Sequence, residues 1–157
     1  MDLLTRARLN RRRESGASAV EFALILPILM TLVFGIITFG FLLAQDLALG
    51  NSSRQAARYG VVRGHSCSAI IAQARRSSEP LVGLDGDDVH VALGRRLATA
   101  DSSVCEDPSV EPCDDSDRDD NLYVTVDFEA ELLVPVIPGV GSTMDLRGQG
   151  VFRCEYS

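Results

Sequence analysis

The sequence predicts an α+β protein in which a long N-terminal transmembrane helix with an amphipathic extension carries a small disulfide-bonded domain of about three antiparallel strands and one short helix. Three observations support this fold class. Residues 22–44 contain no charged side chain, residues 64–157 alternate between short apolar segments and polar turns, and every cysteine lies in that part of the chain. At 157 residues, the chain has room for one modest domain beside the membrane helix.

The uncharged stretch is long enough to cross a membrane. Its 23 residues span about 35 Å as a helix, whereas the hydrocarbon core of a bilayer is about 30 Å thick. Pro27 lacks a backbone N–H, so we expect it to kink the helix or loosen the preceding turn. We expect the helix to continue as an amphipathic stalk that Gly50 interrupts and that Gly60 or Gly64 ends. Residues 17–63 are thus predicted to form the transmembrane and stalk region.

The charges predict how the chain is oriented. Residues 1–16 hold five arginines and two acidic residues, a net charge of +3, whereas the part from Gln45 onward holds 19 acidic residues and 10 arginines, a net charge of −9. Basic flanks stay in the cytoplasm, so we expect a single-pass protein of the cytoplasmic membrane, with its N-terminus inside and residues 64–157 outside. Membrane lipid is an expected partner. The acidic domain gives no electrostatic support for binding nucleic acid.

Four segments of the exported part have regular patterns. A short amphipathic helix is expected first, with arginines in its last turn, and three alternating strands follow. These elements are predicted at residues 67–78, 88–93, 122–131 and 144–153. In the strand over residues 122–131, one face is expected to carry Leu122, Val124, Val126 and Phe128. His90 falls on the polar face of the first strand, and we interpret it as a surface residue. After the second strand, Pro135 and Pro138 interrupt an apolar run.

The four cysteines are Cys67, Cys105, Cys113 and Cys154. An even number of cysteines in an oxidising compartment indicates two disulfides. Of the three possible pairings, we favour a local Cys105–Cys113 bond with Cys67–Cys154 as a long-range clasp. Free buried thiols are the alternative.

Small residues recur along the apolar helix at a spacing of four. The series comprises Ala19, Ala23, Pro27, Thr31 and Gly35, and a second series begins with Gly40 and Ala44. Small side chains let two helix backbones approach closely in lipid, so one interpretation is a packing face for a partner helix. The other is that membrane helices are generally rich in small residues.

Charged residues further along have no strong catalytic or metal-binding pattern. Arg54 and Arg58 share one face of the stalk, either for pairing with acidic groups or as a solvated surface. The spacing of Asp115, Asp117 and Asp119 is similar to that of a calcium loop, but the expected glycine and glutamate are missing, so we favour a solvated acidic loop. We predict no metal, no cofactor and no catalytic residue, and hence no enzyme.

The segment Gly16-Ala17-Ser18-Ala19-Val20-Glu21-Phe22 resembles the prepilin processing motif G-x-x-x-x-E-F/Y. The longer run from Gly16 to Gly60 resembles the TadE-like pseudopilins of the Tad (Flp) tight-adherence pilus system. The resemblance implies that a prepilin peptidase removes residues 1–16 as a basic leader by cutting between Gly16 and Ala17. It also implies that Glu21 meets the N-terminal amine of a neighbouring subunit. The alternative for Glu21 is a snorkelling residue at the membrane edge.

Together these features predict a minor pilin or pseudopilin of a Tad (Flp) type IV pilus assembly or secretion system, acting in pilus biogenesis and adherence. The resemblance implies three partners: the prepilin peptidase, other Tad pilins or pseudopilins, and the inner-membrane assembly platform. The alternative function is an uncleaved, single-pass membrane-anchored binding domain. The two hypotheses differ at Gly16, where a bulky residue should block processing but leave a plain anchor unaffected.

Overall fold

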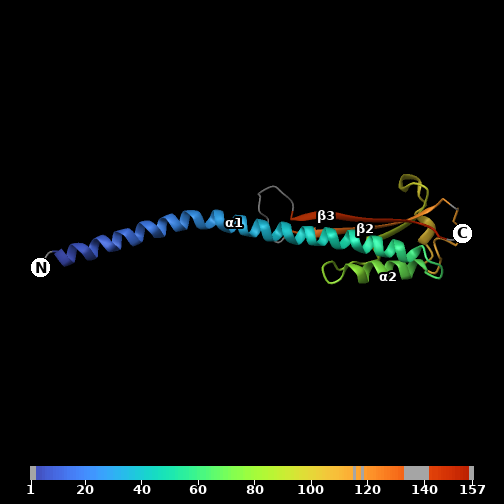
Figure 1. Cartoon of the computed structure of the whole chain (residues 1–157), viewed down its shortest axis with the longest axis horizontal. Helices are drawn as coiled ribbons and strands as arrows, with labels where there is room; N and C mark the ends of the chain where they lie inside the picture. Colours follow the sequence, from blue (N-terminus) through green and yellow to red (C-terminus); the bar gives the residue numbers. More distant parts are fainter. Residues whose placement is uncertain (1–2, 115, 118, 133–141, 156–157) are drawn as a thin grey trace.

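A computed structural model describes residues 3–114, 116–117, 119–132 and 142–155, with side chains from residue 18 onward. The main elements follow the order α1, α2, β1, β2, β3 (Figure 1). Their bounds are Leu3–Gly60 for α1, Cys67–Ser78 for α2, Val89–Gly94 for β1, Asn121–Glu131 for β2 and Thr143–Arg153 for β3. Single 3₁₀ turns lie at Gly86–Asp88, Leu97–Thr99 and Ser103–Cys105. The predicted α+β fold class is confirmed.

Helix α1 is a single helix of 58 residues that extends far beyond the rest of the chain (Figure 1). It ends at Gly60 as predicted, but it passes through Gly50 without a break, so the predicted interruption there was wrong. Pro27 lies inside the helix. The Thr31 hydroxyl donates a hydrogen bond of 2.8 Å to the Pro27 carbonyl oxygen, and Figure 1 shows α1 curved over its N-terminal part.

The sheet has the order β1-β2-β3, and both strand pairs are antiparallel. Val124 of β2 lies opposite Val91 of β1 and Gly150 of β3. Leu122, Val124 and Val126 are fully buried and Phe128 is partly buried against the core, which confirms the apolar face that the alternation predicted.

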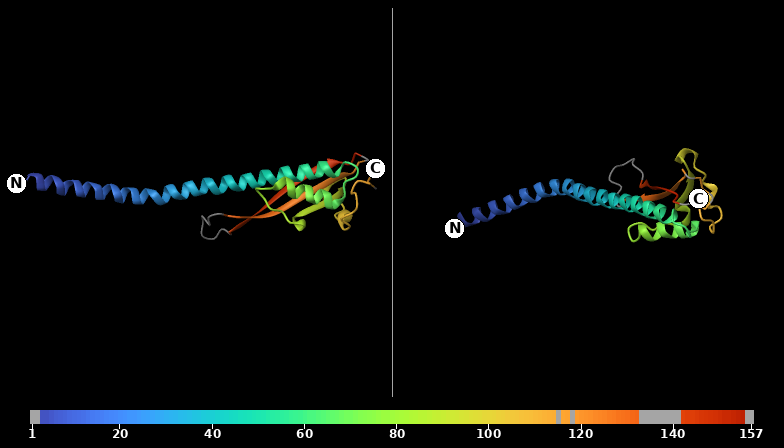
Figure 2. Two further views of the ribbon diagram at one scale, coloured as in Figure 1. Left: turned by 90° about the horizontal axis from the view of Figure 1, so that it is seen from below. Right: turned by 45° about the vertical axis from the view of Figure 1, so that its right-hand side comes forward.

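Helix α2 and the C-terminal part of α1 pack against one another and against the sheet (Figure 2). The core between them contains Ala56 and Ala57 of α1, Ile70 and Ala74 of α2, and the buried side chains of β2. Burying a side chain such as Ile70 stabilises the fold by about 1.5–3 kcal/mol relative to leaving it exposed. The core therefore includes the C-terminal end of α1.

Two glycines of β3 let the backbone of α1 lie directly on the strand. A Cβ atom added at Gly148 would lie 2.5 Å from the carbonyl oxygen of Leu49, and one added at Gly150 would clash with the carbonyl oxygen of Ser53. Glycine inside a strand often marks such a close approach of another backbone. Gly148 and Gly150 therefore form the seat of α1 on the sheet.

The two disulfides are Cys67–Cys105 and Cys113–Cys154, with Cα separations of 5.6 and 5.7 Å. The presence of two disulfides is confirmed, but the predicted pairing was wrong. In an unfolded chain, the lower entropic cost of closing a short loop favours a disulfide between nearby cysteines. In the folded chain, however, Cys105 and Cys113 are each bonded to a distant cysteine instead. The amide of Cys154 donates to the Asp120 carbonyl oxygen at 3.1 Å, which brings the end of β3 to the segment that follows Cys113.

In the acidic segment before β2, two of the described aspartates form ion pairs with arginines. Arg153 donates to Asp119 at 2.7 Å, and Arg95 lies 3.8 Å from Asp117. Asp115, Pro135 and Pro138 lie outside the described residues, so both the calcium-like spacing and the interrupted apolar run stay predictions.

Candidate processing and assembly site

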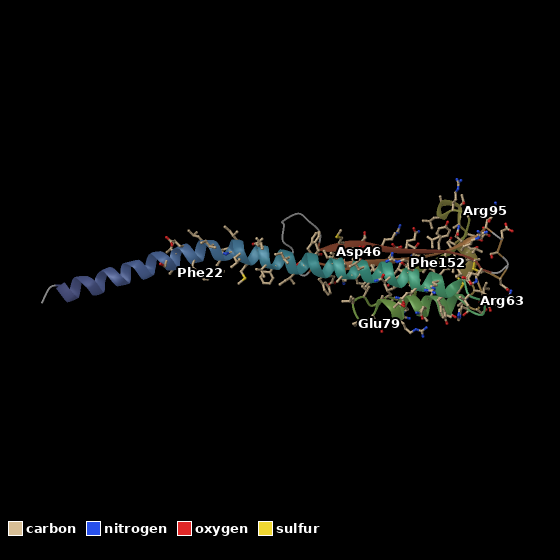
Figure 3. All side chains as sticks on the ribbon, viewed as in Figure 1. Phe22, Asp46, Arg63, Glu79, Arg95 and Phe152 are labelled. Carbon is tan, nitrogen blue, oxygen red and sulfur yellow. A yellow bond between two sulfur atoms is a disulfide. The ribbon has the colours of Figure 1, made fainter. Side chains whose placement is uncertain are left out.

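The residues of the predicted processing motif lie on the part of α1 that projects away from the domain (Figure 3). Gly16 and Ala17 have helical backbone, Glu21 is exposed, and Phe22 is 63 % exposed. The fold therefore leaves Glu21 and Phe22 open to contact by another protein or by lipid.

The apolar segment after Glu21 is exposed almost throughout. Ile28 is 71 % and Phe39 is 74 % exposed, although both side chains are large and apolar. Within Ser18–Gly60 the helix is long and apolar enough to cross a membrane, judged by length and composition. Such a surface is costly in water and favourable in lipid, so the segment is compatible with a single-pass membrane anchor.

The series of small residues lies on this exposed helix, and the domain covers little of it. Ala19, Ala23, Pro27, Thr31 and Gly40 are exposed, whereas Gly35 and Ala44 are partly buried. A Cβ atom added at Gly35 or Gly40 would meet no atom within 4 Å. The fold thus leaves room for a partner helix at these two glycines, and the packing role of the series stays a prediction.

The stalk has one covered and one open side. Leu49, Ala56 and Ala57 are buried against the domain, whereas Leu43 and Leu47 are 53 % and 57 % exposed. The open side of the apolar segment therefore continues at least as far as Leu47.

Two exposed arginines extend this open side. Arg54 donates to the side chain of Asn51 at 3.1 Å, and Arg58 is exposed four residues later. The open side of α1 is therefore apolar near the membrane segment and cationic further along.

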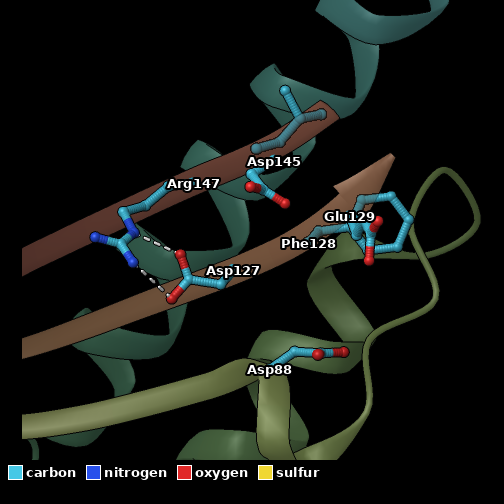
Figure 4. A pocket seen from close by; sticks show the side chains of 7 residues that line it. Asp88, Asp127, Phe128, Glu129, Asp145 and Arg147 are labelled. Atoms are coloured by element: carbon cyan, nitrogen blue, oxygen red, sulfur yellow. Dashed lines mark hydrogen bonds and ion pairs between the residues drawn. The ribbon is translucent and has the colours of Figure 1, made fainter. Parts of the chain in front are cut away.

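The outer face of the sheet, away from α1, carries an ion pair. Arg147 lies directly opposite Asp127 and donates two hydrogen bonds to its carboxylate, the longer being 3.2 Å (Figure 4). This bonding raises the pKa of Arg147 above its usual value, chiefly through the hydrogen bond and then through the charge of Asp127. His90 is 61 % exposed, which agrees with the surface position predicted for it, and its Nε2 atom lies 3.6 Å from Asp127.

A depression of about 410 Å³ beside this ion pair is lined mainly by acidic side chains, including Asp88, Glu129 and Asp145 (Figure 4). Glu129 lies directly opposite Asp145, which places two negative charges on adjacent strands. No group of three or more potential metal ligands occurs in the part of the chain that the structure describes. Sequence reasoning missed this arrangement because it depends on the strand register.

The fold and the motif define a class of protein in which an apolar helix, long enough to span a membrane, carries a disulfide-bonded α+β domain at its C-terminal end. Residues 16–58 match the family model of the TadE-like proteins, so the recognition made from the sequence is confirmed for this part of the chain. The match supports a general association with the Tad pilus. No curated protein and no solved structure matches the chain significantly.

Proposed function

We propose that this chain is a minor pilin or pseudopilin of a Tad (Flp) type IV pilus assembly or secretion system, acting in pilus biogenesis and adherence. The observation that carries the proposal is the family match, which begins at Gly16 and runs through the apolar helix to residue 58. Its function is structural rather than enzymatic. Its partners are the prepilin peptidase, other Tad pilins or pseudopilins, the inner-membrane assembly platform and membrane lipid.

In this proposal the chain has three functional parts. Residues 1–16 are a basic leader that stays on the cytoplasmic side, residues 17–63 are the membrane and stalk helix, and residues 64–157 are the extracytoplasmic domain. Glycine destabilises a helix interior by about 1 kcal/mol relative to alanine, so Gly16 favours the local unwinding that a protease needs. Cleavage after Gly16 makes Ala17 the new N-terminus.

Glu21 then acts in assembly. A charge within a membrane helix costs roughly 2.5–3.5 kcal/mol or more unless it finds a partner. The new amine of Ala17 on a neighbouring subunit supplies the opposite charge, and two opposite charges attract strongly at low dielectric. The series from Ala19 to Gly35 offers the close approach that such pairing requires.

The test is the mass of the mature chain from membranes with and without the cell's prepilin peptidase. We expect a chain that begins at Ala17 only when the peptidase is present, and an uncut chain for Gly16→Leu. Gly35→Leu is the matched control, because it places the same side chain on the same helix outside the motif and should be processed normally. An intact N-terminus in both strains would refute the proposal and favour an uncleaved membrane-anchored binding domain.

A further inference from the structure

The two edge strands of the three-stranded sheet, β1 and β3, differ in whether a loop is hydrogen-bonded to the outer edge. Beside β1, Leu93 donates to the Asp101 carbonyl oxygen at 3.0 Å, and the Asp101 amide donates to that of Leu93 at 2.7 Å. Ser103 in turn donates to the Asp101 carboxylate and lowers its pKa. These bonds tie a loop to the β1 edge and block it there.

The outer edge of β3, a strand of 11 residues, has no further strand beside it in the part of the chain that the structure describes. Among the described residues, β2 is the only strand paired with β3, and Figure 1 shows β3 at the margin of the sheet. Near the two ends of the strand, the side chains of Met144 and Val151 are 51 % and 44 % exposed. An open edge presents unpaired N–H and C=O groups that bind extended segments of other chains.

The glycine seat places α1 on the face of β3, the strand that forms this edge. A Cβ atom added at Gly150 would lie 2.7 Å from the Cα atom of Arg54. Arg58 follows one turn later and is also exposed. A strand added beside β3 would therefore run along the open side of α1, within reach of both guanidinium groups.

The segments of α1 and β3 that meet at the glycine seat form a corner whose net charge is opposite in sign to that of the domain. Residues 47–62 and 146–153 contain Arg54, Arg58, Arg147 and Arg153 and no acidic residue, although the part of the chain from Gln45 onward has a net charge of −9. Arg147 and Arg153 are each bonded to one aspartate. Arg54 and Arg58 thus make the corner attractive to carboxylates.

We propose that the open edge of β3, together with Arg54 and Arg58, binds an extended acidic segment of another protein as a fourth strand. Backbone hydrogen bonds supply the affinity, and carboxylates facing the two arginines supply the specificity. The inference goes beyond the proposed function, since it does not depend on cleavage at Gly16.

A second copy of this chain does not fit the same edge. Antiparallel pairing of two β3 strands would direct the two α1 helices in opposite directions, so they could not enter one membrane from the same side. Side-by-side contact through the open faces of α1 would bring Arg54 and Arg58 of the two copies together, and like charges repel. The occupant is therefore a different, acidic chain.

The test uses the full chain in detergent micelles and a fluorescent synthetic peptide, Thr-Val-Glu-Val-Glu-Val-Thr-Val. We expect saturable binding, measured by fluorescence anisotropy, and slower hydrogen exchange of β3 amides but not of β1 amides. A peptide with the same side chains but N-methyl groups on its four central residues should bind at least about tenfold more weakly, because it cannot form the backbone bonds.

Arginine variants test the charge. The double variant Arg54→Gln/Arg58→Gln should weaken binding about tenfold, whereas the matched pair Arg95→Gln/Arg96→Gln should not. Equal affinity for the plain and N-methylated peptides, or no saturation at about 1 mM peptide, would overturn the proposal. Protection of β3 amides that grows with protein concentration without peptide would identify a second copy as the occupant and would also overturn it.

Discussion

At the scale of single residues, the packing of α1 on β3 depends on the absence of a Cβ atom at two positions of the strand. Gly148 and Gly150 alternate with exposed residues along β3, so both face the helix. Any side chain there would meet backbone atoms of α1 rather than a flexible side chain. Backbone cannot move aside without shifting the whole helix, so these positions tolerate substitution poorly.

We therefore expect Gly150→Ala to lower the free energy of unfolding of the domain by about 1–3 kcal/mol, as inserting a methyl group into a packed site typically does. Thermal unfolding in detergent, followed by circular dichroism, measures the effect. Gly83→Ala is the matched control, because a Cβ atom there meets no atom within 4 Å. Equal melting temperatures for the two variants would contradict the role of the seat.

At the scale of elements, the disulfides connect the loops to the packed core. Cys67–Cys105 joins the start of α2 to the turn at Ser103–Cys105, and Cys113–Cys154 joins the acidic segment to the residue after β3. Each bond closes a loop, with sequence separations of 38 and 41 residues. In the chain-entropy account, each stabilises the fold by about 4 kcal/mol.

Paired serine variants distinguish the observed connectivity from the local one. Cys67→Ser/Cys105→Ser should leave Cys113–Cys154 intact, whereas Cys105→Ser/Cys113→Ser should leave two unpaired thiols. Thiol alkylation and peptide mass mapping without reduction count the free cysteines. A Cys67–Cys154 bond in the second variant with native-like thermal stability would contradict the pairing, because it would show that the clasp predicted from the sequence forms without strain.

At the scale of the whole molecule, one helix belongs to two regions. Helix α1 supplies both the exposed apolar segment, which is long and apolar enough to cross a membrane, and part of the buried core of the domain. The apolar segment and the domain are therefore joined by a continuous helix.

The charge asymmetry gives a prediction at this scale. In the uncut variant Gly16→Leu, which keeps residues 1–16, we expect an N-terminal epitope tag to be protected from protease added to spheroplasts, and a C-terminal tag to be removed, because the arginines of residues 1–16 retain that end in the cytoplasm. Replacing those five arginines with glutamine should leave part of the population inverted. Removal of the N-terminal tag by the added protease from Gly16→Leu with its five arginines intact would contradict the predicted orientation.

The sequence by itself determined the long apolar helix, the TadE-like motif, the short helix α2 and the three strands, because length, charge and periodicity are local properties. The strand boundaries differ from the predicted ones by a residue. Alternation along residues 122–131 also identified Leu122, Val124 and Val126 as the buried face.

Only the tertiary structure decided which distant residues meet. The disulfide pairing, the Asp127–Arg147 ion pair and the continuity of α1 through Gly50 all depend on how the strands register and where the helix lies on them. The alternate spacing of Gly148 and Gly150 places both on one face of the strand. Only the structure shows that the backbone of α1 packs against that face. Packing between distant segments, rather than local propensity, determines these features, since no short-range pattern encodes the partner of a contact.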